Sequence, residues 1–362
     1  MRLVPPGPTA LVDAAANGWD FVFGHVGDLA PTPSTVIDEG PQRTVRRYRS
    51  RRKRAAPHAP LLLVPPLAAP ASCFDLRRGC SLAEHFVGLG YPTYLVDYGA
   101  IAFSDRQLGL EHWVEDVLPN SVRAVSEDAG EPVQLVGWCL GGIMSLLALA
   151  AEPELPVKSA ALVASPFDFT QVRMMAPIRP IAEFTGGRLG TALYRAMGGV
   201  PEPLVRAGYQ LAAIDKYLLK PLTLARNLHN RDFLAQIEAV DDFTNSMLAY
   251  PGRTFGQLYQ RFFIVNEHPG GRLELPERTI DLGDVHVPVL SVAGENDGIA
   301  PAAAVHHIAE LLPNSPQVRL ETAPGGHLGV LTGRAARRTT WTYLDEFLGD
   351  VAESQADAAA AA

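Results

Sequence analysis

The feature that most constrains the fold is the pentapeptide Gly137-Trp138-Cys139-Leu140-Gly141, which joins two strongly apolar stretches. Residues 133–136 have the length and composition of a buried strand, and residues 143–151 form an apolar stretch typical of a buried helix. A sharp turn between such elements strains its central residue, and flanking glycines remove side chains that would collide with the neighbouring elements. The pentapeptide therefore predicts a nucleophile elbow with Cys139 at its tip, at a helix N-terminus that favours a thiolate.

Short apolar runs alternate with helical patterns on both sides of this turn. The predicted strands are residues 61–64, 93–96, 133–136, 160–164, 289–293 and 318–321. Strands that alternate with helices usually form a mostly parallel sheet that is covered by helices on both faces. Together with the elbow, this alternation indicates a chain of the α/β class with an α/β-hydrolase fold.

The alternation lapses between residue 169 and about residue 266, where helical patterns rich in Met, Leu, Tyr and Phe replace the strands. We therefore expect an inserted helical cap at 169–266, placed over the carboxyl edge of the sheet as a gate to Cys139. The other expected parts are an N-terminal arm and hairpin at 1–55, a hydrolase core at 56–168 and 267–349, and a disordered tail at 350–362.

The composition of the chain indicates which kinds of binding partner and which cellular compartment to expect. The formal net charge is −8 at pH 7, so no nucleic acid is expected as a partner. A basic cluster at Arg51–Arg54 is either a solvated loop or a contact for an anionic partner. The three cysteines, Cys73, Cys80 and Cys139, form no CxxC pair, which argues against a disulfide framework and a thiolate metal site. With no signal peptide and no apolar stretch longer than 140–151, we expect a cytoplasmic protein without a membrane span.

The catalytic partners of Cys139 are predicted from chain order. A thiol needs a base, and in this fold the nucleophile is followed by the acid and then by the histidine. Asp297 follows the predicted strand 289–293, and His327 follows the predicted strand 318–321. Both loops lie at the carboxyl ends of strands, where such folds place their active sites. We therefore expect His327 to deprotonate Cys139 and Asp297 to orient and polarise His327.

Other titratable residues compete for these roles. Glu295 shares the loop of Asp297 and remains the alternative acid, although it lies nearer to the strand. Asp97 ends a strand at the correct edge, but we expect it to be structural. Four further residues lie within a helix or before a strand and are expected to have packing or surface roles: His306, His307, Asp284 and His286.

The oxyanion hole is expected to consist of two backbone N–H groups. One belongs to Leu140, the residue after the nucleophile. The other belongs to the loop after strand 61–64, where Pro65 and Pro66 have no N–H, so that Leu67 supplies the first donor.

Further motifs surround these residues. They are Leu62–Leu67, Cys73–Arg77, Tyr94–Gly99, Gly137–Gly142, Asp241–Thr244 and Pro269–Gly271. In combination they resemble the polyhydroxyalkanoate synthase family over roughly residues 35–348, and Gly137–Gly142 resembles its GxCxGG box. Cys139, Asp297 and His327 fall where that family keeps its nucleophile, acid and histidine. The length is closer to synthases that need a second subunit than to the large single-subunit synthases.

The resemblance implies an acyltransferase that moves 3-hydroxyacyl groups from CoA, through a thioester on Cys139, onto a growing polyester chain. It implies no cofactor apart from the coenzyme A thioester that serves as the substrate. Expected partners are the polyester chain or the surface of its granule, and either a second copy of the chain or a second synthase subunit. Two alternatives stay open: a thioesterase or intracellular polyester depolymerase of the same fold, and a non-catalytic granule-associated protein.

Overall fold

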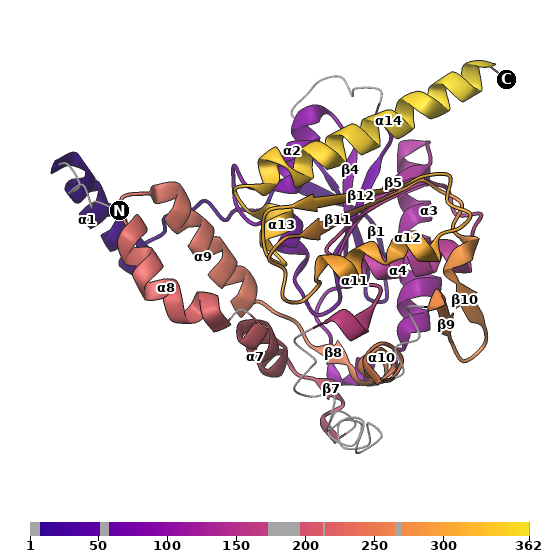
Figure 1. The fold of residues 1–362 in the computed structure, drawn as a ribbon, viewed down its shortest axis with the longest axis horizontal. Helices are drawn as coiled ribbons and strands as arrows, with labels where there is room; N and C mark the ends of the chain where they lie inside the picture. The colour runs from indigo at the N-terminus through magenta and orange to yellow at the C-terminus, as the bar shows by residue number, and fades with distance from the viewer. Residues whose placement is uncertain (1–7, 51–57, 173–195, 213, 265–269, 362) are drawn as a thin grey trace.

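The computed structural model describes residues 8–50, 58–172, 196–212, 214–264 and 270–361, and these are built around an eight-stranded sheet (Figure 1). In spatial order the strands are β1 (Ser34–Gly40), β2 (Arg43–Tyr48), β4 (Thr93–Asp97), β3 (Leu61–Val64), β5 (Val133–Trp138), β6 (Val157–Val163), β11 (Val289–Gly294) and β12 (Val318–Ala323). All six strands predicted from the sequence are present in this sheet, with β12 as a partly exposed edge strand, which confirms the predicted α/β-hydrolase fold.

The sheet is parallel from β4 to β12 and antiparallel at one edge. The predicted N-terminal hairpin is β1 and β2, and β2 pairs antiparallel with β4. Val45 on β2 lies opposite Val96 on β4, and both side chains are fully buried. The hairpin therefore extends the main sheet instead of standing apart from it.

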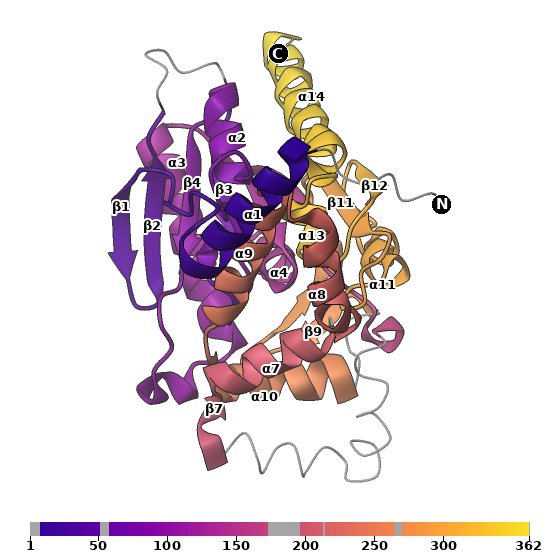
Figure 2. The same cartoon turned by 90° about the vertical axis from the view of Figure 1, so that its left-hand side faces the viewer.

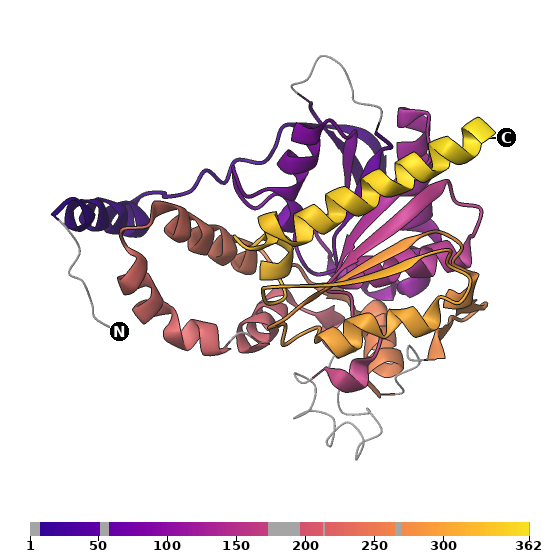
Figure 3. The ribbon, with the colours of Figure 1, turned by 45° about the horizontal axis from the view of Figure 1, so that its top comes forward.

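Helices cover both faces of the sheet, as Figure 3 shows for α14, which runs across one face. The covering helices are α3 (Leu118–Ala129) and α4 (Leu140–Ala151) on one face, and α2 (Leu82–Leu89) and α14 (Thr340–Ala361) on the other. Alternate residues of a strand point to opposite faces, so Leu62 and Val64 join one apolar cluster whereas Leu61 and Leu63 join the other.

The described residues between 169 and 264 are mostly helical, as predicted, and also contain two short paired strands that the sequence did not predict. The elements are η4 (Phe169–Gln171), β7 (Gly199–Val200), α7 (Glu202–Ala212), α8 (Ile214–Asn227), α9 (Arg231–Asn245), β8 (Tyr250–Pro251), α10 (Gly252–Leu258) and η6 (Tyr259–Ile264). Helices α7, α8 and α9 project to one side of the sheet, and the N-terminal helix α1 (Pro8–Phe23) lies against α9 (Figures 1 and 2).

The prediction of a disordered tail at 350–362 is wrong for residues 350–361, because helix α14 continues to Ala361. Alanine has the highest helix propensity, so the terminal alanine run prolongs the helix that precedes it. The basic cluster Arg51–Arg54 lies outside the described residues. In the part of the chain that the structure describes, no helix has the length and apolar character needed to cross a membrane.

Candidate active site

Cys139 stands alone between the end of β5 and the start of α4, as the elbow requires. Its backbone has φ 54° and ψ −124°, a conformation that residues other than glycine rarely adopt. Its N–H donates to the carbonyl of Val163 on β6, at 2.9 Å, which fixes the turn to the neighbouring strand. Such strain is kept where the surroundings impose it, and it is common at functional sites.

The glycines of the elbow are needed because other parts of the chain approach them closely. A Cβ atom at Gly141 would lie 2.2 Å from the carbonyl oxygen of Val64, the last residue of β3, and 2.7 Å from that of Pro65 in the loop that follows. A Cβ atom at Gly137 would lie 2.5 Å from the Cα of Gly142. These distances are far below van der Waals contact, so the elbow and the loop after β3 pack together only with glycine at these positions.

Asp297 and His327 are brought together by two loops that follow neighbouring strands. Asp297 Oδ2 lies 2.8 Å from His327 Nδ1, and Oδ1 of the same carboxylate accepts the N–H groups of Ile299 and Ala300, both at 2.8 Å. The Asp297 side chain is fully buried and the His327 side chain is 7% exposed. These three hydrogen bonds hold the Asp297 carboxylate in one orientation. The carboxylate in turn fixes the orientation of the imidazole and keeps its proton on Nδ1.

The remaining ring nitrogen, Nε2 of His327, is buried and contacts no oxygen or nitrogen partner among the described residues. Burial lowers the pKa of His327, but the charges of Cys139 and Asp297 and hydrogen bonding outweigh burial and raise this pKa to about 10. At neutral pH His327 is therefore protonated, and its imidazolium can stabilise a negative charge that develops beside it. Of the three predicted residues, Asp297 and His327 are in direct contact, and Cys139 acts on the same imidazole through its charge.

The competing residues lie elsewhere or make structural contacts. Glu295 is exposed, whereas Asp297 in the same loop is buried against His327. Asp97 accepts the N–H of Gly99 at 3.0 Å, as expected of a residue that shapes a turn. The others also lie away from the dyad: Asp284 and His286 are exposed, His306 Nε2 contacts the carbonyl oxygen of Glu321, and His307 pairs with Glu310.

Trp138 is a site residue that sequence reasoning did not assign. Its side chain is fully buried, and its Nε1–H donates to the carbonyl oxygen of His327 at 3.2 Å. The centres of the Trp138 and His327 rings are 5.1 Å apart. Trp138 thus supports the histidine loop from the strand that carries the nucleophile. The sequence signals this role of Trp138 only by placing a large side chain directly before Cys139.

The two predicted oxyanion donors have free N–H groups within the described part of the chain. Neither the amide of Leu140 nor that of Leu67 donates a hydrogen bond there, and both residues are buried. The approach of Gly141 to Val64 brings the loop of Leu67 against the elbow. This arrangement leaves both donors available to an oxygen of a substrate.

Residues from the predicted cap line the surroundings of Cys139. Tyr209 on α7 and Tyr250 on β8 pack with Cys139 on one apolar cluster that also contains Phe243 and Met247. Burial, and then the charge of Cys139, raise the pKa of Tyr209 and of Tyr250. Both phenols therefore stay protonated at neutral pH, and Cys139 is half-buried.

A cavity of about 300 Å³ opens next to this cluster. Tyr250 lines the cavity and also packs against this apolar cluster, whereas Cys139, Asp297 and His327 do not line the cavity. Its other lining residues come from the segments 101–103, 197–203 and 249. Among the described residues no group of three or more His, Cys, Asp or Glu side chains is arranged to hold a metal ion.

Comparison with known proteins gives a consistent result. The model of the alpha/beta hydrolase fold family matches residues 59–334. The poly(3-hydroxyalkanoate) polymerase subunit PhaC of Haloferax mediterranei is 23% identical over 331 residues, which is 91% of this chain and 66% of that protein. The subunit of the same name from Allochromatium vinosum is 26% identical, over 81% of this chain and 82% of that protein. These similarities confirm the family resemblance predicted from the motifs.

A solved structure shows the fold again. Alpha/beta hydrolase domain-containing protein 10 from mouse superposes with a TM-score of 0.50 and 16% sequence identity. The match covers 88% of this chain and 99% of the mouse chain. At this level of identity the likeness concerns the arrangement of strands and helices.

Proposed function

The chain belongs to the α/β-hydrolase fold family, and from this premise we propose that it is a polyhydroxyalkanoate synthase-like acyltransferase with Cys139 as its nucleophile. The observation that carries the proposal is the buried Asp297–His327 pair, whose imidazole has a pKa of about 10 beside Cys139 at the elbow. The substrate class, a 3-hydroxyacyl-CoA, is proposed from the names of the related polymerases.

In the first half-reaction the Cys139 thiolate attacks the carbonyl carbon of the thioester. The oxygen becomes an oxyanion, and the N–H groups of Leu140 and Leu67 stabilise it. The bond between the carbonyl carbon and the CoA sulfur then breaks, and His327 gives its Nε2 proton to the leaving thiolate. One thioester replaces another, so the acyl group on Cys139 remains activated.

In the second half-reaction a hydroxyl group of a growing chain or of a second 3-hydroxyacyl-CoA attacks the acyl-enzyme. His327, now neutral, accepts the hydroxyl proton at Nε2, while Asp297 stabilises the imidazolium that forms. An ester bond forms and the Cys139 thiolate leaves. Repetition of this cycle lengthens the polyester.

We also propose that residues 169–266 act as a cap that keeps water from the acyl-enzyme. The packing of Tyr209, Phe243, Met247 and Tyr250 beside Cys139 supports this role. Exclusion of water matters because water would release the acyl group as a free acid, which is the outcome expected of a thioesterase or depolymerase.

The expected partners follow from the same resemblance. Large apolar side chains are exposed on the projecting helices: Trp19 and Phe23 on α1, Leu211 on α7, and Leu218 on α8. Their exposure supports the expectation of an apolar contact with polyester, with a second copy of the chain or with a second subunit. Light scattering of the purified protein, with and without polyester granules, separates these possibilities.

The test is incubation with 3-hydroxybutyryl-CoA, followed by measurement of free CoA and extraction of polymer. A synthase releases CoA and accumulates polyester, whereas a hydrolase releases CoA and free acid. A non-catalytic protein releases nothing. Cys73→Ala is the matched control for Cys139→Ala, because Cys73 is a free, buried cysteine in η1 and lies on no elbow.

A further inference from the structure

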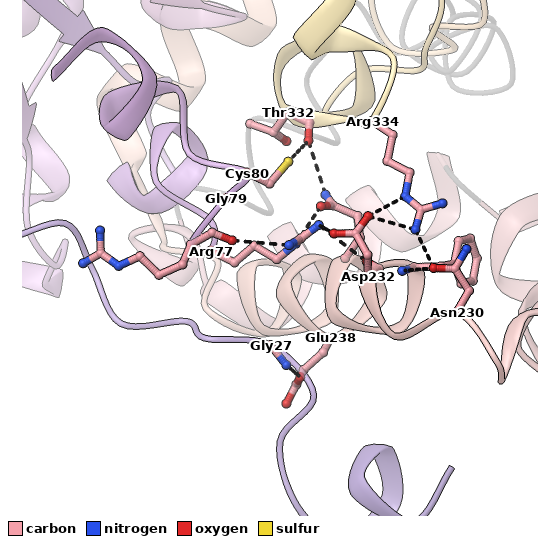
Figure 4. A network of polar contacts seen from close by, with 12 residues as sticks. Gly27, Arg77, Gly79, Cys80, Asn230, Asp232, Glu238, Thr332 and Arg334 are labelled. Atoms are coloured by element: carbon pink, nitrogen blue, oxygen red, sulfur yellow. Dashed lines mark hydrogen bonds and ion pairs between the residues drawn. The ribbon is translucent and has the colours of Figure 1, made fainter. Parts of the chain in front are cut away.

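The N-terminal end of helix α9 is tied to two core loops through one carboxylate (Figure 4). Arg77 Nη2 donates to Asp232 Oδ1 at 2.7 Å, and Arg334 Nε donates to Asp232 Oδ2 at 2.9 Å. The Arg77 side chain is 6% exposed, whereas those of Asp232 and Arg334 are 51% and 42% exposed. Each carboxylate oxygen therefore binds a guanidinium from a different loop.

Neighbouring contacts extend this tie. Gln236, one helical turn after Asp232, accepts from Arg77 Nε at 3.0 Å and donates to the carbonyl of Thr332 at 3.4 Å. Arg334 Nη2 also donates to Asn230 Oδ1 at 2.8 Å, and the same oxygen caps α9 by accepting the N–H of Phe233. Burial raises the pKa of Asp232, but the two arginines outweigh it and hold that pKa below its usual range, so the carboxylate is ionised at neutral pH.

The two loops that meet at Asp232 both belong to the proposed active site. Arg77 follows η1 (Ala71–Phe74), in the connection after β3 that also contains Leu67. Arg334 follows α13 (Gly329–Thr332), which begins two residues after His327. The carboxylate thus joins α9 to the loop that carries an oxyanion donor and to the loop that carries the histidine.

One face of α9 extends from the arginines to Trp138, the residue before Cys139. Asp232, Gln236, Ala239 and Phe243 recur at intervals of three or four residues, so they share one face of the helix. The polar end of this face binds the arginines, and at the other end the Phe243 ring lies 6.1 Å from the ring of Trp138. Beyond the helix, the N–H of Leu248 donates to the carbonyl of Ala68 at 2.9 Å. Helix α9 is therefore fixed at both ends across the site.

We propose that Asp232 is a positioning residue that latches α9 over Cys139 and holds the Leu67 and His327 loops in register. Release of the latch lets α9 move away from the nucleophile, which admits bulky reagents and water. The expected effect on turnover rests on the proposed function of Cys139. The position of α9, in contrast, can be measured without any turnover.

The experiment compares the labelling of Cys139 by a small reagent, iodoacetamide, and by a bulky maleimide, with the labelled peptide followed by mass spectrometry. In Asp232→Asn the bulky reagent is expected to react at least about fivefold faster than in wild type, because the population of the displaced form rises. The small reagent is expected to change by less than about twofold. Asp232→Glu, which restores the charge, should return the bulky rate toward wild type.

Asp20→Asn is the matched control. Asp20 pairs with Arg231, the residue next to Asp232 on the same helix, at 2.7 Å, and both side chains are about half exposed. This change removes a carboxylate of α1 that pairs with the first residue of α9, and it leaves the site loops untouched, so both labelling rates should equal those of wild type. An Asp232→Asn protein that is folded but labels like Asp20→Asn with both reagents overturns the proposal.

Two further measurements test the latch if the Asp232→Asn protein does not fold. Arg334→Gln removes the exposed partner alone and should raise the bulky rate in the same direction. In wild type, added NaCl should also raise the bulky rate, because salt screens the half-exposed pair. A rate of labelling by the bulky maleimide that is unchanged in both measurements overturns the latch.

With 3-hydroxybutyryl-CoA, latch variants should also yield more free acid relative to polymer. Failure of the proposed function would instead show as no CoA release from wild type.

Discussion

Replacement of Asp297 by asparagine tests how the site controls His327. The carboxylate uses Oδ1 for the N–H groups of Ile299 and Ala300 and Oδ2 for the imidazole. In one orientation of the asparagine, its oxygen accepts the same two backbone N–H groups. Its NH₂ group then points at Nδ1 of His327 and selects the tautomer in which Nδ1 carries no proton. The reverse orientation keeps the imidazole contact but places the NH₂ against two backbone donors. Neither orientation satisfies the site.

The magnitude follows from the lost charge. A hydrogen bond to a charged group contributes about 1.5–3 kcal/mol, and one pKa unit corresponds to about 1.4 kcal/mol. Asp297→Asn should therefore lower the pKa of His327 from about 10 by about one to two units. The same energy, lost from the transition state, lowers kcat about 10- to 150-fold.

The assay is the pH dependence of CoA release. His327 must be protonated to give its proton to the leaving CoA thiolate, so activity falls as pH rises through its pKa. In wild type this decline should centre near pH 10, and in Asp297→Asn it should move to about pH 8–9. Glu295→Gln is the matched control in the same loop and should match wild type. A larger loss in Glu295→Gln than in Asp297→Asn, or an unmoved alkaline limb, would refute the assignment of the acid.

The remaining predictions concern the histidine, the elbow and its support. His327→Gln should lower CoA release by at least about 10³-fold, since proton transfer in both half-reactions is lost; a loss below tenfold would argue against its role. Gly141→Ala should destabilise the fold by about 1–3 kcal/mol or more, measured by urea denaturation, because its Cβ would lie 2.2 Å from Val64 O; unchanged stability would contradict the elbow packing. Trp138→Phe should lower kcat about 2- to 10-fold with little change in KM, because the hydrogen bond to His327 O is lost; a change in KM alone would contradict this.

The core, the elbow and the contact of Asp297 with His327 could be predicted because their signals in the sequence are local. Buried strands such as β5 are continuous apolar runs, and the glycines beside Cys139 mark a turn with a single practical geometry. Parallel strands share one carboxyl edge, so chain order was enough to predict that the loops of Asp297 and His327 meet. The contact of 2.8 Å between Asp297 and His327 agrees with that expectation.

The parts that were missed depend on partners distant in sequence. The hydrogen bond of Trp138 to the His327 loop spans 189 residues, and the latch at Asp232 reaches Arg77 across 155 residues. No periodicity within a helix or strand encodes such pairs. The tail was mispredicted for a different reason: the alanine run was interpreted as low complexity, although alanine also continues helix α14.

The measurement that tests the central claim most directly is the mass of the peptide that contains Cys139 after rapid mixing with 3-hydroxybutyryl-CoA and acid quenching. The account predicts that a 3-hydroxyacyl group appears on Cys139 at the rate of CoA release, that hydroxylamine removes it as expected for a thioester, and that Cys139→Ala releases no CoA. Release of CoA by Cys139→Ala at close to the wild-type rate, or an acyl group on a residue other than Cys139, would contradict it.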